Sequence, residues 1–100
     1  MAERSWHELL TEYSETLSTL AAADARFLEE DGALPAWVKQ LMALQLDAVF
    51  NHPRGVRWYG RRAQELGATS EQIVEALRIL SIFAGRPALV TGAERLRDLK

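Results

Sequence analysis

The sequence predicts an all-α fold, a bundle of about five helices. Apolar residues recur at steps of three and four along five successive segments, which is the period of an amphipathic helix. Capping residues, prolines and glycines separate these segments, as helix start and stop signals do. No segment alternates apolar and polar residues in the way of a half-buried strand, and no internal repeat is evident.

The first predicted helix covers residues 5–30. Ser5 and Glu8 have the spacing of a capping box, S-x-x-E, at its start. Asp31 and Gly32 form a stop and turn signal at its end.

The second predicted helix covers residues 35–50 and begins with Pro35 in its first turn. Its apolar residues leave almost no polar face, so we expect it to be buried on several sides. In a chain of this size it must lie at the centre of the domain, at a subunit interface, or both. Gln40, Asp47 and Asn51 fall on one side of this helix. They line either a polar cavity or a solvent-facing edge.

The third predicted helix begins at the dipeptide His52-Pro53 and stops at Gly67. Proline disfavours helical geometry in the residue before it, so we expect His52 to be the cap and Pro53 the first helical residue. The inward stripe of this helix is predicted to be Val56, Tyr59, Ala63 and Leu66.

Two further helices complete the predicted bundle. Thr69 and Gln72 form a second capping box before a helix over residues 70–84, which Gly85 ends. Pro87 opens the last helix, with the inward residues Leu89, Val90, Ala93, Leu96 and Leu99. Its small residues Thr91, Gly92 and Ala93 favour a tight helix crossing.

The composition indicates one globular domain over residues 1–100, because 48% of residues are hydrophobic and 26% are charged. A net charge of -2 without a basic run argues against a nucleic-acid or membrane-surface partner. The sequence has no cysteine, which excludes thiolate catalysis and thiolate metal ligands and agrees with a cytoplasmic location. The apolar runs are too short to span a bilayer.

From Gly32 onward the chain resembles the carboxymuconolactone decarboxylase family, which includes the alkylhydroperoxidase D (AhpD) proteins. The resemblance is carried by an ordered series of motifs, each at the family's spacing. The series is Gly32-Ala33-Leu34, Lys39-Gln40-Leu41, Tyr59-x3-Ala63-x3-Gly67-Ala68-Thr69, Glu71-Gln72-Ile73-x-Glu75-Ala76 and Ala84-Gly85-Arg86-Pro87-Ala88. It implies an AhpD-like core over residues 32–100 behind an N-terminal helix at 1–31. It also implies a homotrimer or homohexamer, and we expect the second helix and part of the first to lie between chains.

The resemblance also shows where this chain departs from the family. The redox members use a glutamate, two cysteines spaced C-x-x-C and a histidine, and these positions correspond to Gln40, His52, Gly55 and Tyr59. None of them keeps the redox residue, and a thiol peroxidase needs a thiolate. The decarboxylase branch uses no cysteine and shares Pro53, but it commonly has histidine where Tyr59 stands. The resemblance therefore implies a cysteine-free, decarboxylase-like protein.

Three residues are the predicted catalytic group: His52, Tyr59 and Gln40. The amide groups and the positive dipole end at a helix N-terminus favour an anion. We expect His52 to be the general base, Tyr59 the acid or oxyanion donor, and Gln40 a neutral orienting group. Arg57 or Arg86 is expected to bind a substrate carboxylate.

The predicted activity is that of a cofactor-free lyase on a small carboxylate or lactone. The alternative is a non-catalytic oligomer that binds a small ligand or serves as a scaffold. In that case His52 is a helix cap and Tyr59 a core aromatic residue. No metal is expected, because His7 and His52 have no ligand spacing with the scattered carboxylates.

Overall fold

The computed structural model describes residue 8 and residues 12–97. The described part of the chain contains five helices and no strand, which confirms the all-α prediction. These helices are α2 (Glu15–Glu29), α3 (Ala36–Val49), α4 (Pro53–Glu65), α5 (Ser70–Ala84) and α6 (Arg86–Leu96). The chain divides into two compact units, Met1–Glu30 and Asp31–Lys100, and each is described by itself.

The first unit contains α2, and the prediction of one helix over residues 5–30 is wrong. Residues 12 and 13 form a turn, and Ser14 has extended backbone angles (φ -160°, ψ 130°). The Ser14 side chain accepts a hydrogen bond from the amide of Leu17, so Ser14 caps a helix that begins at Glu15. A serine hydroxyl competes with helical hydrogen bonding and favours a cap, which the apolar period alone does not reveal. Ser5 of the predicted capping box lies outside the described residues.

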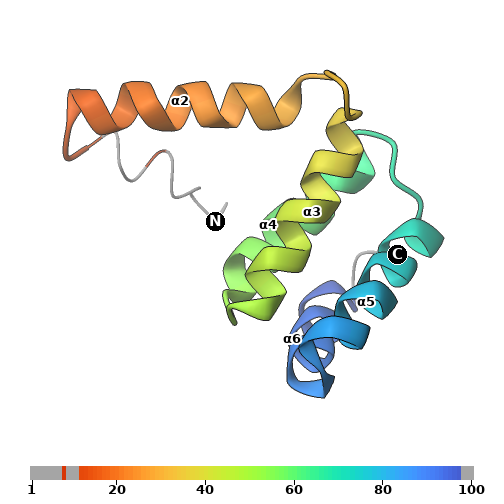
Figure 1. Cartoon of the computed structure of the whole chain (residues 1–100). Coiled ribbons are helices and arrows are strands. Elements are labelled where there is room, and N and C mark those ends of the chain that lie inside the picture. The colour runs from red at the N-terminus through yellow and green to blue at the C-terminus, as the bar shows by residue number, and fades with distance from the viewer. Residues whose placement is uncertain (1–7, 9–11, 98–100) are drawn as a thin grey trace. The chain divides into compact units, whose positions relative to one another are not determined.

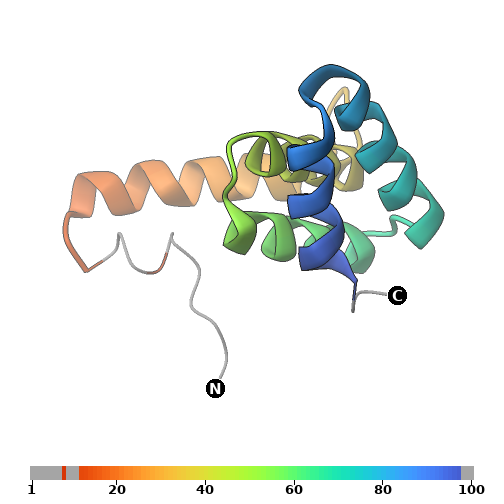
Figure 2. The ribbon, with the colours of Figure 1, turned by 90° about the horizontal axis from the view of Figure 1, so that it is seen from below.

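The second unit is built on the helical hairpin of α3 and α4, which lie side by side (Figures 1 and 2). Helices α5 and α6 pack against each other, and α3 contacts both of them. Helix α6 also packs against α4. The hairpin therefore forms the centre of this unit.

The helix boundaries of this unit confirm most of the predicted signals. Asp31, which was predicted only as part of a stop and turn signal, also accepts a hydrogen bond at Oδ1 from the amide of Ala36, the first residue of α3 (2.7 Å). Thr69 and Gln72 form the predicted capping box at the start of α5. Gly67 follows the end of α4 with φ +115°, a backbone angle that favours glycine.

The core is assembled from one side of each helix. Helix α4 buries Val56, Tyr59 and Ala63 as predicted, while Leu66 is half-buried. The buried residues of α5 are Ile73, Ala76, Leu77 and Leu80.

The prediction for the inward side of α6 is partly wrong. Leu96 is buried, but Val90 and Ala93 are exposed, and Leu99 lies outside the described residues. The buried set is Ala88, Gly92 and Leu96, which recur every four residues. A Cβ placed on Gly92 would lie 2.4 Å from Leu77 Cδ2, so this glycine permits the predicted tight crossing of α6 on α5. The inward side of α6 is therefore the side on which its backbone can approach α5 closely, and not the side with the larger apolar side chains.

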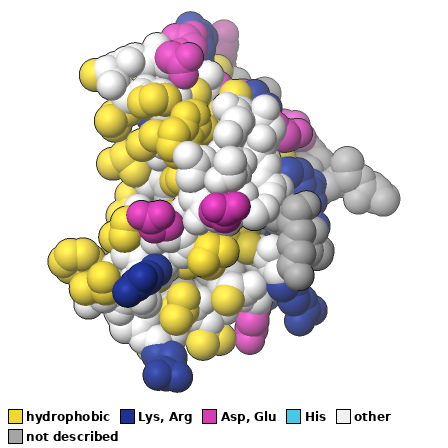
Figure 3. All heavy atoms as spheres, turned by 90° about the vertical axis from the view of Figure 1, so that its right-hand side faces the viewer, with side chains coloured by type: hydrophobic (Ala, Val, Ile, Leu, Met, Phe, Trp, Pro, Cys, Tyr) yellow, Lys and Arg dark blue, Asp and Glu magenta, His cyan; other side chains and the backbone are white. Residues whose placement is uncertain are grey.

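Among the described residues of the second unit, helix α3 is buried on one side only. Its buried side includes Leu41, Leu44 and Ala48, as well as Gln40. Its opposite side exposes large apolar side chains at Met42, Leu46 and Val49, and Phe50, the C-cap of α3, is exposed as well. Figure 3, which views the molecule from the side where α5 lies in Figure 1, shows hydrophobic side chains in patches between a few charged groups.

Candidate functional site

The turn between α3 and α4 is held by backbone hydrogen bonds and fixes the position of His52. The His52 amide donates to the Asp47 carbonyl (2.7 Å), and the Asn51 amide donates to the Ala48 carbonyl (3.2 Å). Asn51 has φ +59°, a left-handed conformation that asparagine adopts more readily than most residues. As predicted, His52 is the N-cap of α4 and Pro53 is its first residue.

The side chains of Asp47 and His52 form a pair at this turn. His52 Nδ1 lies 3.2 Å from Asp47 Oδ1, with side-chain exposures of 64% and 22%. An ionised carboxylate only accepts hydrogen bonds, so Nδ1 carries the proton in this pair. The other ring nitrogen, Nε2, is then the atom that can accept a proton from a substrate. A carboxylate that orients a histidine in this way is a common arrangement for general base catalysis.

Gly55 gives the Asp47 carboxylate its place against the first turn of α4. A Cβ atom on Gly55 would lie 1.9 Å from Asp47 Oδ2 and 2.6 Å from Asp47 Cγ. The carboxylate therefore lies against the helix N-terminus, where the dipole favours negative charge. The sequence predicted a substrate anion at this end of α4, whereas in the free chain the Asp47 side chain supplies the negative charge.

The other two predicted catalytic residues lie inside the hairpin. Gln40 on α3 is 1% exposed and Tyr59 on α4 is 8% exposed. His52 and Tyr59 are seven residues apart, which separates them by about 10 Å along the helix axis. Val56, which is fully buried, lies between them on the same side of α4. Two members of the group are thus buried and one is exposed, and the catalytic roles of all three stay predictions.

The two predicted carboxylate-binding arginines have different surroundings. Arg57 is half-buried on α4. It is two residues from Tyr59, so their side chains leave the helix on nearly opposite sides. Arg86 is exposed and is the first residue of α6.

A hydrogen bond brings α6 to the turn that carries His52. Thr91 Oγ1 on α6 donates to Asn51 Oδ1 (3.2 Å), and the same hydroxyl lies 3.1 Å from the Pro87 carbonyl oxygen. Helix α6, whose first residue is Arg86, therefore contacts the turn that carries His52.

Sequence reasoning missed Asp47 as the partner of His52. It placed Asp47 on one side of the second helix with Gln40 and Asn51. In the structure Gln40 is buried, Asp47 is half-buried and Asn51 is exposed. The signal was the five-residue spacing of Asp47 and His52 across a helix end, which becomes a contact only when the hairpin turn reverses the chain.

The fold and the site define a small all-helical protein with a histidine–carboxylate pair at the turn of its central hairpin. The model of the carboxymuconolactone decarboxylase family matches residues 11–98, and the chain belongs to this family. Searches of curated proteins and of solved structures found no match. Within the described residues, no helix is long and apolar enough to cross a membrane. In the same part of the chain, no three histidine, aspartate or glutamate side chains are grouped to hold a metal ion.

Proposed function

We propose that this chain is a cofactor-free lyase that acts on a small carboxylate or lactone. The observation that carries the proposal is the Asp47–His52 pair, in which Nδ1 faces the carboxylate and Nε2 is the proton acceptor. Membership of the carboxymuconolactone decarboxylase family supports the reaction class. The absence of cysteine from the sequence supports a reaction other than thiol peroxidation.

In the proposed reaction, His52 Nε2 takes a proton from the carbon next to a carbonyl group of the substrate. The electron pair of the broken C–H bond moves onto the carbonyl oxygen, and Asp47 stabilises the imidazolium that forms. When the carbonyl re-forms, the electron pair forms a C=C bond to the neighbouring carbon, the lactone C–O bond at that carbon breaks, and the leaving carboxylate takes the proton from His52. With a carboxylate β to the carbonyl, the C–C bond to the carboxylate breaks in place of the C–H bond, carbon dioxide leaves, the electron pair forms the same enolate, and one proton from solvent, delivered by His52, completes the product. Tyr59 would donate a hydrogen bond to the developing oxyanion, and Arg57 or Arg86 would bind the substrate carboxylate.

The test is turnover of a panel of small lactones and carboxylates, followed by ultraviolet absorbance and by carbon dioxide release. General acid–base groups contribute about 10²- to 10⁴-fold to rate, so His52→Ala should lower kcat/KM by roughly that factor. Asp47→Asn should lower it in the same direction, because the amide cannot stabilise an imidazolium equally. His7→Ala, at the other histidine of the sequence, is the matched control. Equal turnover by wild type and His52→Ala would remove the catalytic assignment.

The burial of Tyr59 favours a second candidate function, a non-catalytic oligomer that binds a small ligand or acts as a scaffold. A side chain that is 8% exposed in the hairpin interior fits a core aromatic residue. This candidate predicts no turnover across the panel and ligand binding that His52→Ala leaves unchanged, measured by titration calorimetry. A drop in turnover for His52→Ala but not for Tyr59→Phe would instead keep the lyase and limit the site to the Asp47–His52 pair.

We also propose that the protein is a cytoplasmic homo-oligomer, a trimer or a hexamer. The exposed apolar side of α3 supports self-association, because monomers rarely leave such a side in water. The cysteine-free sequence supports the cytoplasmic location.

A further inference from the structure

The turn that carries His52 has the hydrogen-bond pattern of a Schellman motif, in which a helix ends at a residue with a left-handed backbone. The His52 amide donates to the Asp47 carbonyl, five residues earlier (2.7 Å), and the Asn51 amide donates to the Ala48 carbonyl, three residues earlier (3.2 Å). Because Phe50 is the C-cap of α3, the left-handed position of the motif falls on Asn51, with φ +59°. The backbone angle of Asn51 therefore decides how α3 ends and where His52 lies.

The same motif explains why Asp47 and His52 meet. In a Schellman motif the residue after the left-handed one lies beside the residue five positions earlier, and an apolar contact frequently joins the two. Here these two positions hold an acid and a histidine, and Asp47 Oδ1 lies 3.2 Å from His52 Nδ1. The pair depends on the left-handed angle of Asn51, so a group that holds Asn51 in place also holds the pair.

Asparagine at this position differs from the usual glycine by its side chain. Glycine adopts a positive φ freely, whereas asparagine carries a Cβ atom that makes this angle less favourable. The side chain of Asn51 makes a bond that glycine cannot make, since Thr91 Oγ1 on α6 donates to Asn51 Oδ1 (3.2 Å). This bond joins residues 40 positions apart in the sequence and so ties the end of α3 to a distant helix.

The Thr91 hydroxyl has a second acceptor, the Pro87 carbonyl oxygen at 3.1 Å. One hydroxyl carries a single proton, so the two acceptors share it when the amide oxygen of Asn51 faces Thr91. When the amide is turned over, its Nδ2 group donates to Thr91 Oγ1 and the hydroxyl donates to Pro87. Both orientations of the amide therefore join the turn to α6.

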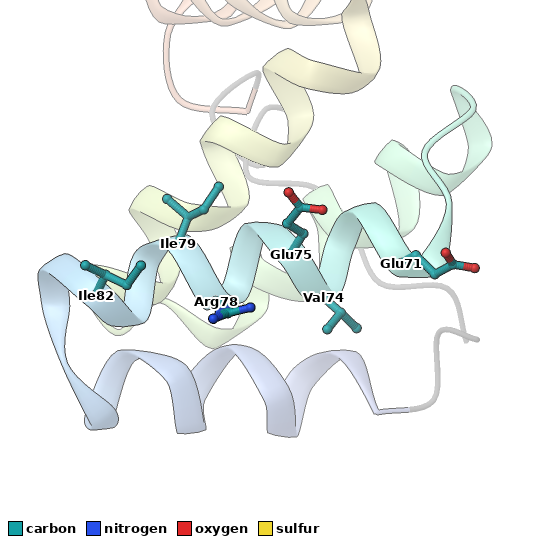
Figure 4. Close-up of a pocket in the computed structure, with 6 residues that line it drawn as sticks. All are labelled: Glu71, Val74, Glu75, Arg78, Ile79 and Ile82. Atoms are coloured by element: carbon teal, nitrogen blue, oxygen red, sulfur yellow. The ribbon is translucent and has the colours of Figure 1, made fainter.

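Helix α6 is held next to this turn by its contacts with two other helices. A Cβ atom on Gly92, the neighbour of Thr91, would lie 3.9 Å from the Cβ atom of Ala48, which is buried in the last turn of α3. Gly92 also lies against Leu77 of α5, and Figure 4 shows α6 running beside α5. The groove in that view is lined by residues of α5 alone, so it is separate from the turn. The packing of α6 thus fixes the place from which Thr91 reaches Asn51.

We propose that Asn51 is a positioning residue for His52, and that Thr91 is the group on α6 that holds Asn51 in its left-handed conformation. Asn51 acts through the turn, which keeps Nδ1 of His52 towards Asp47 and leaves Nε2 as the proton acceptor. The catalytic value of this positioning rests on the proposed lyase function. The positioning itself does not, because it is measured on the protein without a substrate.

The test is the tautomer of the neutral His52 ring, measured from its ¹⁵N chemical shifts in a His7→Gln background that leaves one histidine. Asn51→Gly keeps the left-handed angle and removes the amide, whereas Thr91→Val removes the hydroxyl with little change of shape. Each should lower the ratio of the Nδ1–H to the Nε2–H tautomer roughly 2- to 10-fold, the factor that one hydrogen bond contributes. Thr91→Ser keeps the hydroxyl and should retain the wild-type ratio.

Three further variants show whether these effects come from one bond. Asn51→Gly combined with Thr91→Val should lower the ratio no further than either change alone, because both remove the same bond. Asn51→Ala should lower it more than Asn51→Gly, because alanine disfavours the left-handed angle. Thr19→Val is the matched control and should leave the ratio unchanged. Thr19 Oγ1 on α2 donates to the carbonyl four residues earlier, at Glu15 (3.0 Å), as the Thr91 hydroxyl does to that of Pro87.

The outcomes separate this proposal from the lyase function. An unchanged tautomer ratio in Asn51→Gly would overturn the role of Asn51, and an unchanged ratio in Thr91→Val would overturn that of Thr91. Effects that multiply in the double variant would also overturn the shared bond. With a substrate that wild type turns over, Thr91→Val should lower kcat by a similar factor with little change in KM, and Thr91→Ser should restore it. A wild type without turnover would overturn the lyase function and leave the tautomer result standing.

Discussion

Replacement of Gly55 by alanine tests the contact that positions the Asp47–His52 pair. The new Cβ would lie 1.9 Å from Asp47 Oδ2, 2.6 Å from Asp47 Cγ and 3.3 Å from Asp47 Cβ. Rotation of the Asp47 carboxylate away from α4 relieves the two contacts shorter than 3.0 Å, and a shift of a few tenths of an ångström relieves the contact with Asp47 Cβ. His52 then loses its carboxylate partner.

Two opposing effects decide the stability of Gly55→Ala. Alanine in place of a helical glycine stabilises by roughly 1 kcal/mol. Moving a carboxylate from a helix N-terminus costs about 0.3–1 kcal/mol. The exposed pair with His52 contributes little, because solvent screens it. We therefore expect a net change in the free energy of unfolding close to zero.

A double-mutant cycle separates these effects. In an Asp47→Ala background only the Cβ contact of 3.3 Å remains, so Gly55→Ala should stabilise by most of the ~1 kcal/mol. Urea unfolding of the four proteins measures the coupling between the two positions, which we expect to be of the order of 1 kcal/mol. The ¹⁵N chemical shifts of His52 provide an independent signal. They should show the Nδ1–H tautomer in wild type and its loss in Gly55→Ala. Additive stability effects together with an unchanged tautomer would refute the reasoning.

Three further predictions concern the frame around the site. Gly92→Ala should destabilise by about 1–2 kcal/mol in urea unfolding, because its Cβ would lie 2.4 Å from Leu77 Cδ2. An increase in the urea midpoint would contradict this. Thr69→Ala should cost about 1 kcal/mol through loss of the capping box, whereas Ser81→Ala, which removes an exposed bond to a carbonyl within α5, should be nearly neutral. Gly67→Ala should cost about 1 kcal/mol in thermal unfolding, although a Cβ meets no atom within 4 Å, because the φ of +115° disfavours any side chain. A rise in Tm would show that the backbone relaxes there.

Local signals predicted the helices of the second unit closely. The start of α4 at Pro53, the capping box of α5 and the stop at Gly67 each depend on a few neighbouring residues. Such signals can be recognised in the sequence because they reflect hydrogen bonds and backbone angles within one turn. The same reasoning failed where two local signals competed, since the cap at Ser14 interrupts an apolar period that continues across it.

The candidate site was predictable only in part. The sequence showed His52 at the start of a helix, and the structure confirms this position. It did not show that Asp47 faces His52, nor that Tyr59 and Gln40 are buried while His52 is exposed. Those facts depend on how the hairpin turn reverses the chain, and helical periodicity carries no information about that turn.

The sequence by itself determined the all-α class, most helix boundaries and the absence of a thiolate. Each of these follows from residue identity or from interactions within a few residues. Only the tertiary structure decided which side of each helix is covered, as the choice of Gly92 over Val90 in α6 and the uncovered side of α3 illustrate. The physical reason is that a helix side is buried only when another backbone can approach it, and that approach depends on residues distant in the sequence.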